Sequence, residues 1–523
     1  MTRERLPIGI QDFETIRNEG FHYVDKTQLI RELVAEGRYY FLSRPRRFGK
    51  SLLINTIKAL FEGQETLFQG LNIHEHWDWS ANHAVIRLSF GGKYNQSEDI
   101  ERSIVTQLEL IERSAGLDLA HDKCTGPERL QTVIYNLRRK TGNRVVILVD
   151  EYDKPILDTI EYPALARANR DYLRGFYGII KDSAEHIRFA FVTGISMFSK
   201  VSLFSGLNNL VDISLDPRFA TLCGYTDDDI DTVFVSELDG LDRDEIRKWY
   251  NGYHWRGETR VYNPYDVLLL LWSREFRPYW FETGSPGFLF ETVVKNSVTP
   301  MELEGRLTDM SLVSKLDVND IGVDALLFQT GYLTITEELR EGYRTYYRLD
   351  YPNLEVKLSF NDQLLAHLDE RNRVPIEEGA NLRDLLAAND FRGFADTLRS
   401  WFSSIPYQWQ NKSDLSRYEA WYAGLLHMCF RAINVDVRVE EASSHGRADM
   451  VVHIEGQVFI FEFKMAWSKD GVEAILDAAF TQMRERGYAD KYLHGAKSVY
   501  LVGVACGREA RNLLEVRAEQ AGR

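Results

Sequence analysis

Short apolar runs alternate with longer segments of helical periodicity through the first part of the chain. The runs have the length and composition of buried strands and span residues 38–42, 83–90, 144–150 and 187–194. Strands that alternate with helices predict α/β units around a mostly parallel sheet. We therefore expect an α/β domain over about residues 1–285.

The pattern changes twice further along. Residues 286–410 are helix-rich, with strand candidates at 326–335 and 343–351, and we expect a helical lid or winged-helix-like region there. From residue 411 the pattern predicts a helix, three strands, a second helix, a strand over 498–505 and a final helix from about Arg508. That order indicates a second compact α/β domain over 411–523.

Composition supports a folded, soluble protein. With 523 residues and 44% hydrophobic composition, the chain is long enough for two or three domains with their own cores. It has no secretory signal and no apolar run near the roughly 20 residues that cross a bilayer, so we expect a cytoplasmic protein and no membrane partner. The four cysteines are widely separated, which favours structural roles. A net charge of -15 excludes bulk electrostatic coating of nucleic acid, so any such contact must be local.

Gly49, Lys50 and Ser51 stand where a strand and a turn give way to a helix. Backbone N–H groups and the helix dipole favour an anion at such a point, a lysine reaches the outer phosphates, and a hydroxyl binds magnesium. The usual pattern begins with a glycine where this chain has Arg44. Arg44 either remodels the loop or contacts the nucleotide itself. A basic turn before a surface helix is the alternative.

A second acidic element fits the same nucleotide chemistry. The apolar strand Val145–Val149 ends in Asp150 and Glu151, where a hydrated metal and a water-activating base are needed. The strand over 187–194 brings Thr193 to its carboxyl end, as a sensor of the terminal phosphate or a simple cap. The sequence therefore predicts an ATP and Mg²⁺ site.

The segments SRPRRFGKSLL, VDKT, LVDEYDKPI and FVTGIS resemble the AAA-ATPase-like proteins of bacteria and archaea. In that family the domain is commonly joined to a C-terminal domain of the PD-(D/E)XK nuclease superfamily. The resemblance covers most of the chain. It implies Lys50, Ser51 and Asp150 as nucleotide and magnesium ligands, with Glu151 beside them.

A hairpin near the C-terminus carries a second set of ionisable residues. Two strands around a turn at Glu455-Gly456 would place Asp449 in the first strand and Glu462 and Lys464 in the second. Residues two apart share a strand face, so Glu462 and Lys464 project together while Phe461 and Phe463 project into a core. A surface salt bridge on an edge strand is the bland alternative.

Two carboxylates and an amine are what phosphodiester hydrolysis needs. We assign Asp449 and Glu462 as ligands of Mg²⁺ or Mn²⁺, with the carbonyl of Phe463 as a further ligand, and Lys464 as the group that handles the attacking water.

Four neighbouring residues resemble or adjoin the same superfamily's site. Glu419, on a helix whose apolar residues Tyr418, Tyr422, Leu425 and Cys429 predict packing on the core, resembles an accessory metal ligand, although a solvated glutamate is the alternative. Gln482 and Tyr488 resemble the family's Q-x(5)-Y element, with Gln482 as an accessory group and Tyr488 as a core or substrate-facing residue. His445 is read as a loop histidine.

The sequence thus predicts an ATP-regulated, metal-dependent nuclease that cleaves DNA rather than RNA, in defence against foreign DNA or in mobile-element biology. A nucleotide-switched protein whose inactive nuclease fold only binds nucleic acid or a partner is the alternative. A third reading is a signalling ATPase that forms homo-oligomers.

Overall fold

The computed structural model describes residues 5–96, 98–117, 124–197, 209–282, 287–296, 298, 300–309, 316–317, 320–368, 375–403, 415–432, 435–443, 446–467, 471–508, 510 and 512–522. The chain divides into two compact units, which are Met1–Phe288 with Arg306–Glu355, and Leu289–Gly305 with Val356–Arg523. The predicted three-part division at residues 285 and 410 stays a prediction. Predicted His445 lies outside the described residues.

The first unit is built on a five-stranded sheet in the order β2-β3-β4-β1-β5, and every pairing in it is parallel. Its strands are β1 (Tyr39–Ser43), β2 (Val85–Ser89), β3 (Val145–Asp150), β4 (Ile187–Gly194) and β5 (Val211–Asp212). The predicted α/β domain with a parallel sheet is confirmed. β3 is buried along its whole length, which explains why its sequence is a continuous apolar run rather than an alternating one.

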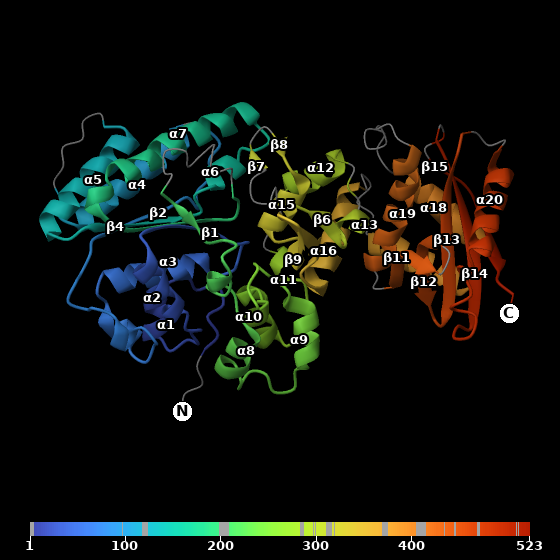
Figure 1. Ribbon diagram of the computed structural model, residues 1–523, viewed down its shortest axis with the longest axis horizontal. Coiled ribbons are helices and arrows are strands. Elements are labelled where there is room, and N and C mark those ends of the chain that lie inside the picture. The colour runs from blue at the N-terminus through green and yellow to red at the C-terminus, as the bar shows by residue number, and fades with distance from the viewer. Residues whose placement is uncertain are drawn as a thin grey trace. The chain divides into compact units, whose positions relative to one another are not determined.

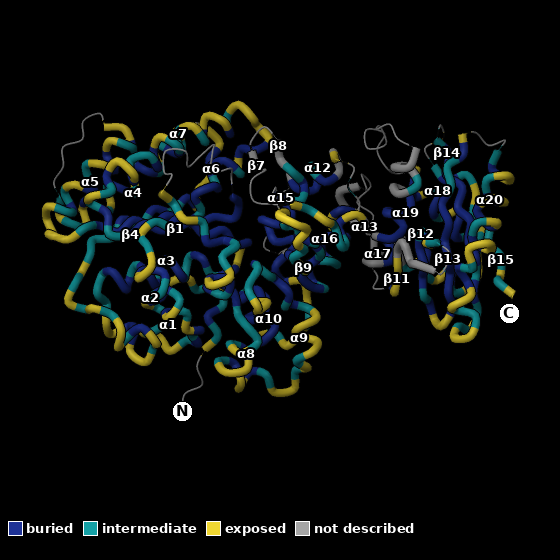
Figure 2. The backbone as a smooth tube through the Cα atoms, in the orientation of Figure 1, coloured by how far each residue is buried: buried dark blue, intermediate teal, exposed yellow. Residues whose placement is uncertain are grey.

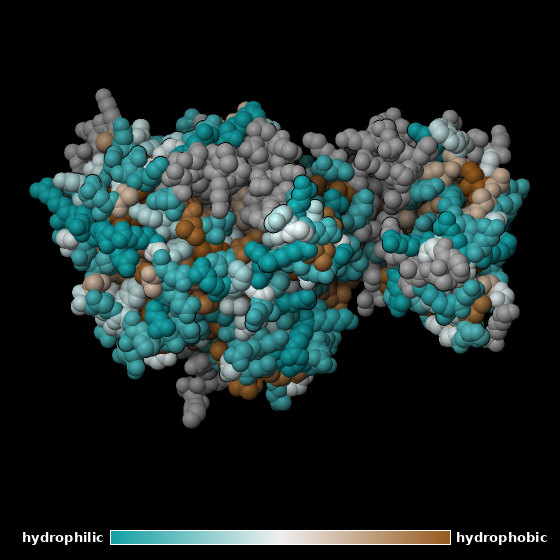
Figure 3. Space-filling model, viewed as in Figure 1, coloured by the Kyte–Doolittle hydropathy of each residue, from teal (hydrophilic) through white to brown (hydrophobic). Residues whose placement is uncertain are grey.

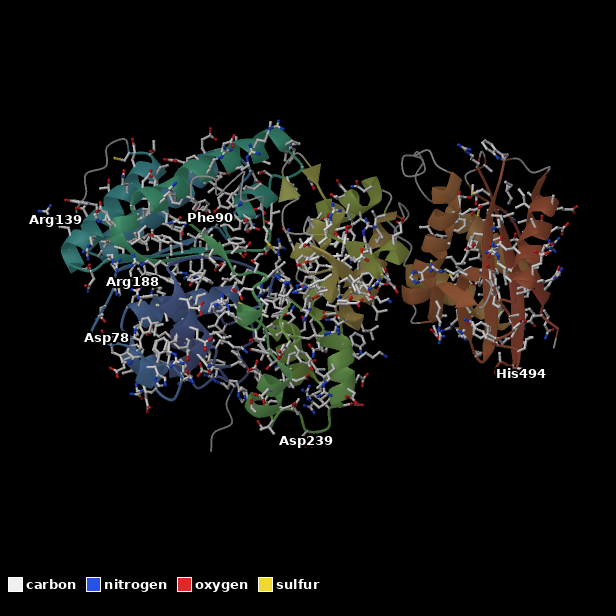
Figure 4. The ribbon with its side chains drawn as sticks, in the orientation of Figure 1. Asp78, Phe90, Arg139, Arg188, Asp239 and His494 are labelled. Atoms are coloured by element: carbon white, nitrogen blue, oxygen red, sulfur yellow. The ribbon has the colours of Figure 1, made fainter. Side chains whose placement is uncertain are left out.

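Helices cover both faces of this sheet (Figure 1), with α1, α2 and α3 on one side and α4, α5 and α7 on the other. Their bounds are α1 (Phe13–Asn18), α2 (Thr27–Glu36), α3 (Lys50–Phe61), α4 (Glu98–Ser114), α5 (Gly126–Thr141), α6 (Lys154–Leu157) and α7 (Pro163–Asp182). The strands between the two helical layers are buried (Figure 2). Phe90, which follows β2 and is fully buried, lies among packed side chains in Figure 4, whereas Arg139 of α5 extends from the periphery.

The rest of the first unit is helical with a small antiparallel sheet in the order β6-β10-β9. Its elements are α8 (Asp227–Val233), α9 (Arg243–Tyr250), α10 (Pro264–Ser273), α11 (Tyr279–Glu282), β6 (Arg306–Thr308), β7 (Leu316–Asp317), β8 (Asp320–Ile321), α15 (Val323–Thr330), β9 (Thr334–Glu341) and β10 (Arg344–Asp350). The strand expected at 343–351 is confirmed. The strand expected at 326–335 is wrong except for its last two residues, because α15 continues to Thr330 and ends at Gly331, whose φ of 93° stops the helix, and β9 begins only at Thr334.

The second unit contains a mixed five-stranded sheet in the order β11-β12-β13-β14-β15. Its strands are β11 (Asp436–Ser443), β12 (Gly446–Ile454), β13 (Gln457–Ala466), β14 (Ser498–Gly507) and β15 (Asn512–Gln520). The final helix expected from about Arg508 is wrong, because residues 512–520 form β15 and pair antiparallel with β14. β15 pairs with the edge of β14, and the helical propensity of residues 512–520 alone does not reveal this tertiary contact.

Helices pack on both faces of this sheet (Figure 1), with α17 (Pro375–Ala387), α18 (Phe391–Phe402) and α19 (Leu415–Ala432) on one side and α20 (Val472–Glu485) on the other. The unit also contains α12 (Gly287–Lys295), α13 (Pro300–Leu303) and α16 (Leu354–Leu368), and the first residues of α12 and α16 belong to the other unit. Gly503 of β14 lets α20 approach, since a Cβ there would lie 3.0 Å from Phe480. Phe461 of β13 packs against Phe394 of α18, 6.0 Å between ring centroids.

Surface features agree with the composition. The face seen in Figure 3 is mostly hydrophilic, with hydrophobic residues scattered over it. Within the described part of the chain, no helix combines the length and apolar character that a bilayer crossing requires. Cys223, Cys429 and Cys506 are buried, as expected of structural cysteines, whereas Cys124 is exposed.

Candidate functional site

The strand order brings the predicted nucleotide-binding residues to one edge of the first sheet. β4 lies between β1 and β3, with Ser43 opposite Gly194 and Val149 opposite Val192. Because the three strands are parallel, their carboxyl ends meet at the same edge. The loop after β1, Thr193 at the end of β4 and Asp150 at the end of β3 are therefore neighbours.

The loop from Arg44 to Gly49 turns the chain from β1 into α3. Gly49 is the N-cap of α3 and has a φ of 88°, a left-handed conformation in which a side chain would be strained. Lys50 and Ser51 are the first two residues of the helix, where N–H groups lack helical partners. The backbone therefore has the form of an anion-binding helix start, as predicted.

Arg44 lies in the interior rather than toward a ligand. It is fully buried, and its guanidinium donates to the carbonyl oxygens of Ser43 at 2.8 Å, Ser214 at 2.9 Å and Phe219 at 3.3 Å. It also stacks on Trp255, 4.1 Å from the ring centroid, and burial lowers its pKa to about 10. Of the two roles expected for Arg44, these contacts favour shaping the loop over contacting the nucleotide.

Lys50 folds back onto its own loop. Its Nζ donates to the carbonyl oxygens of Arg44 at 2.8 Å and Pro45 at 2.7 Å. Burial lowers the pKa of Lys50, and the negative charges of Asp150 and Glu151 oppose that shift. The amine is thus close to the predicted acidic residues but bonded to neutral carbonyls.

Asp150 is buried and accepts a hydrogen bond from Thr193 Oγ1 at 2.9 Å. The following residue, Glu151, has a φ of 55°, which turns the chain sharply out of β3. Burial, and then the charge of Asp150, raise the pKa of Glu151. A carboxylate with a raised pKa is suited to accept a proton from water, which is the role predicted for Glu151.

Asp153 was not singled out from the sequence, although it stands in the same DEYD segment. It is buried and accepts hydrogen bonds from the backbone N–H groups of Ile195 at 3.1 Å and Ser196 at 2.6 Å. Burial raises the pKa of Asp153, and the bonds from Ser196 oppose that shift. Asp153 therefore fixes the segment after β4 against β3. The sequence signal for Asp153 was a third acidic residue within a few positions of the end of a buried strand.

A cavity of about 390 Å³ opens over this edge of the sheet. Phosphate-binding candidates Lys50 and Ser51 line it together with acidic Glu151 and Asp153. Its remaining wall is largely apolar and includes Ile10, Tyr225, Tyr265 and Leu268. Arg47 stacks on Tyr265 at 4.7 Å, a contact the sequence did not reveal. The cavity thus joins a charged floor to an apolar wall, which suits a nucleotide's phosphates and base.

The second set of predicted residues lies on the hairpin of β12 and β13. The strands pair antiparallel from Ile454 opposite Gln457 to Met450 opposite Phe461. Glu455 and Gly456 form the turn with φ values of 49° and 81°, as the short hairpin requires. Phe461 packs on Phe394 of α18 whereas Glu462 is bonded to Gln482 of α20, so neighbouring residues of β13 face opposite helical layers and the predicted alternation of faces is confirmed.

Asp449, Glu462 and Lys464 come together at the end of this hairpin. Lys464 Nζ lies 2.8 Å from Glu462 Oε1, and Asp449 Oδ2 accepts the backbone N–H of Phe463 at 2.8 Å. The side chain of Glu462 is 1% exposed and that of Lys464 is 26% exposed. The lysine therefore bridges a buried carboxylate and the surface.

Burial and charge perturb this cluster strongly. Burial, and then the charge of Asp449, raise the pKa of Glu462 to about 7, while Lys464 opposes the shift. Burial disfavours the charge of Lys464, but its bond to Glu462 and the negative charges of Glu462, Glu419 and Asp449 together outweigh that effect and raise the pKa of Lys464. Glu462 Oε2 is buried and has no hydrogen-bond partner among the described residues. A buried carboxylate oxygen without a partner is costly in a folded protein.

Accessory residues surround Glu462. Gln482 of α20 donates to Glu462 Oε1, and its Nε2 lies 3.4 Å from the hydroxyl of buried Tyr488. Exposed Arg486, which the sequence reading missed, donates to the same hydroxyl at 3.3 Å and faces the charge of Glu462. The signal for Arg486 was its place inside the Gln482–Tyr488 element.

Glu419 makes a contact that the sequence did not predict. Its Oε1 accepts the backbone N–H of Met465 at 2.9 Å, which ties α19 to β13. Among the residues described, no three His, Cys, Asp or Glu side chains form a group ready to hold a metal. The predicted metal site therefore rests on the carboxylates of Asp449 and Glu462, and Glu419 stays a proposed accessory ligand.

Two family models match the two parts of the chain that carry the candidate sites. Residues 7–204 match the family model described as a predicted AAA-ATPase, and residues 417–516 match that of the PD-(D/E)XK nuclease superfamily. Over 527 aligned residues the chain is 47% identical to an uncharacterized protein in the vnfD 5′ region of Azotobacter chroococcum mcd 1, with all of both chains covered.

Proposed function

The chain belongs to the AAA-ATPase-like family and ends in a PD-(D/E)XK nuclease superfamily domain, and from this premise we propose that it is an ATP-regulated, metal-dependent nuclease. DNA is the proposed substrate. Defence against foreign DNA or mobile-element biology is the proposed setting, and both follow from the family resemblance. The single observation that carries the proposal is the contact of Lys464 with buried Glu462 beside Asp449.

The residues present fit Mg²⁺ or Mn²⁺. Asp449, Glu462 and the carbonyl of Phe463 would offer oxygen ligands, and the unpaired Oε2 of Glu462 would gain a partner. Mg²⁺ is commonly held by only one or two carboxylates and keeps several waters. When bound, the metal would supply Lewis-acid polarisation of the phosphate.

The protein's own groups would do the remaining work. Lys464 Nζ would orient the attacking water and stabilise negative charge on the phosphate. Gln482 holds Glu462 from the α20 side, so it would keep that carboxylate in place. Asp449, which already accepts the N–H of Phe463, would be fixed by the hairpin backbone.

In the first unit, Lys50 would exchange the carbonyls of Arg44 and Pro45 for the outer phosphates of ATP. Ser51 and Asp150 would hold the hydrated metal, Glu151 would activate water, and Thr193 would respond to the terminal phosphate through Asp150. Nucleotide state would then set whether the nuclease unit cleaves.

The test is a cleavage assay with the full chain on duplex DNA, single-stranded DNA and RNA. It is run with Mg²⁺ or Mn²⁺ and with ATP, ADP or no nucleotide. Lys464→Ala should lower cleavage by about 10²–10⁴-fold, the usual contribution of one proton-handling group, and leave ATP binding unchanged. Exposed Lys497, at the opposite end of β13 and β14, gives the matched control Lys497→Ala. Cleavage that persists in both Asp449→Ala and Lys464→Ala would overturn the assignment.

A further inference from the structure

Trp467 is exposed at the end of the strand that carries the candidate nuclease residues. Its exposed fraction is 61%, and among the described residues of its unit it is the one large hydrophobic side chain at the surface. By contrast, Trp401 of the same unit is 7% exposed. An exposed indole offers a large aromatic face on which a planar ligand group can stack.

Arg508 holds the indole in place. Its guanidinium lies 4.3 Å from the centroid of the Trp467 ring, and its backbone N–H donates to the carbonyl of Ala466 at 2.9 Å. β13 and β14 run parallel up to the pair Ala466 and Gly507, so Trp467 and Arg508 leave the sheet side by side. We call these two residues the Trp467–Arg508 platform.

The platform stands at the same end of the sheet as the candidate catalytic cluster. Trp467 is the first residue after β13 and follows Lys464 by three residues, a distance of about 10 Å along the chain. Arg486, whose charge acts on Glu462, is exposed after α20, and exposed Arg447 stands two residues before Asp449 on β12. In a chain with a net charge of -15, these arginines and Lys464 are a local supply of positive charge.

We propose that the Trp467–Arg508 platform binds an unpaired nucleobase next to the scissile phosphate, and that the nuclease acts on single-stranded segments of its substrate. This inference rests on the proposed function and names its substrate class. One face of the indole is taken by Arg508, so the other can stack on a base. Inside a duplex both faces of a base are covered by its neighbours, and only an unpaired base can stack on a side chain.

Binding is measured in the full chain on a Lys464→Ala background, which separates it from cleavage. The probes are a labelled single-stranded oligonucleotide and its duplex, titrated with Mg²⁺ present and followed by fluorescence anisotropy. Trp467→Ala should weaken single-strand binding by at least about 5-fold, the lower end for loss of one base–aromatic stack, and change duplex binding by less than about 2-fold. Trp467→Phe should restore most of the loss, because the aromatic face returns.

Trp272 of α10, which is 68% exposed, provides the matched control, and Trp272→Ala should leave both affinities unchanged. Arg508→Ala should weaken single-strand binding and reduce the salt dependence by about one phosphate contact if the arginine also reaches the backbone. Unchanged or equal losses on both probes in Trp467→Ala would overturn the platform while leaving the nuclease proposal intact.

The two proposals fail in different ways. If the chain with native Lys464 binds neither probe, both are overturned. If binding depends on Trp467 but no metal supports cleavage, the platform stands and the proposed nuclease function falls.

Discussion

Both candidate sites hold a lysine beside acidic residues, but the two lysines have different partners. Lys50 donates to two carbonyls of its own loop, at 2.8 and 2.7 Å, whereas Lys464 donates to the carboxylate of Glu462 at 2.8 Å. A lysine on neutral carbonyls gains charge pairing when phosphate arrives, while a lysine on a carboxylate is already paired. The first site is therefore arranged to rearrange around its ligand, and the second is preformed.

Replacing Arg44 tests the rigid part of the first site and should have the largest effect. Arg44→Leu would remove the guanidinium from three buried carbonyls, of which that of Phe219 also accepts the N–H of Leu222, and the loss costs about 3–5 kcal/mol. We expect a fall in the Tm of that unit of roughly 10 °C or a failure to fold, followed by calorimetry. Arg46→Ala, in the same loop but exposed, is the control and should melt close to the native protein. A nearly native Tm for Arg44→Leu would contradict the structural role.

Replacing Lys50 tests the part of the first site that should rearrange. Lys50→Ala should weaken ATP binding by about 100-fold, as expected for loss of a charged hydrogen bond to phosphate, with a much smaller loss of stability than Arg44→Leu. Calorimetric titration with ATP measures the first quantity and thermal melting the second. Cleavage without nucleotide should be unchanged. An equal loss of stability in the two variants would remove the distinction between them.

The two sites also differ in how well the sequence predicts them. The nuclease cluster is largely local, because Asp449, Glu462 and Lys464 sit on one hairpin whose turn and alternation follow from residue spacing. The nucleotide edge needs β4 between β1 and β3, and the chain pattern gives the strands but not their order. Consequently the sequence could not show whether the side chain of Arg44 points into the interior or toward a ligand. Its orientation depends on contacts with Ser214, Phe219 and Trp255.

Tertiary pairing accounts for the other errors. Residues 512–520 look helical alone but form β15 because β14 offers a partner. The bond from the N–H of Met465 to Glu419 was likewise not foreseen, because it depends on how α19 packs, and the accessory metal role of Glu419 stays a prediction.

Each candidate site has one neutral side chain that donates a hydrogen bond to a proposed metal-binding carboxylate, so the two donors can be compared. Thr193 donates to Asp150, and Gln482 donates to Glu462. Loss of a group that orients a metal-binding carboxylate typically costs 10–100-fold, so we expect about that loss of ATP turnover in Thr193→Val and of cleavage in Gln482→Leu. Thr193→Ser, which keeps the hydroxyl, should retain most turnover. If either variant impairs only the other unit's reaction, the two sites are coupled more tightly than their separate contacts indicate.

The smallest expected effect is a proton released when metal binds the preformed site. The pKa of Glu462 is about 7, because burial and Asp449 both disfavour its charge, whereas Lys464 has a raised pKa and stays charged. At about pH 6 Glu462 is mostly protonated, so Mg²⁺ binding should release about 0.9 proton, and at about pH 8 only about 0.1. Metal affinity should therefore rise with pH across that window. Titration calorimetry without nucleotide, in buffers of different ionisation enthalpy, measures the release. Glu419→Gln should keep this linkage and Glu462→Gln should lose it, whereas a release that grows with pH would place the titrating group elsewhere.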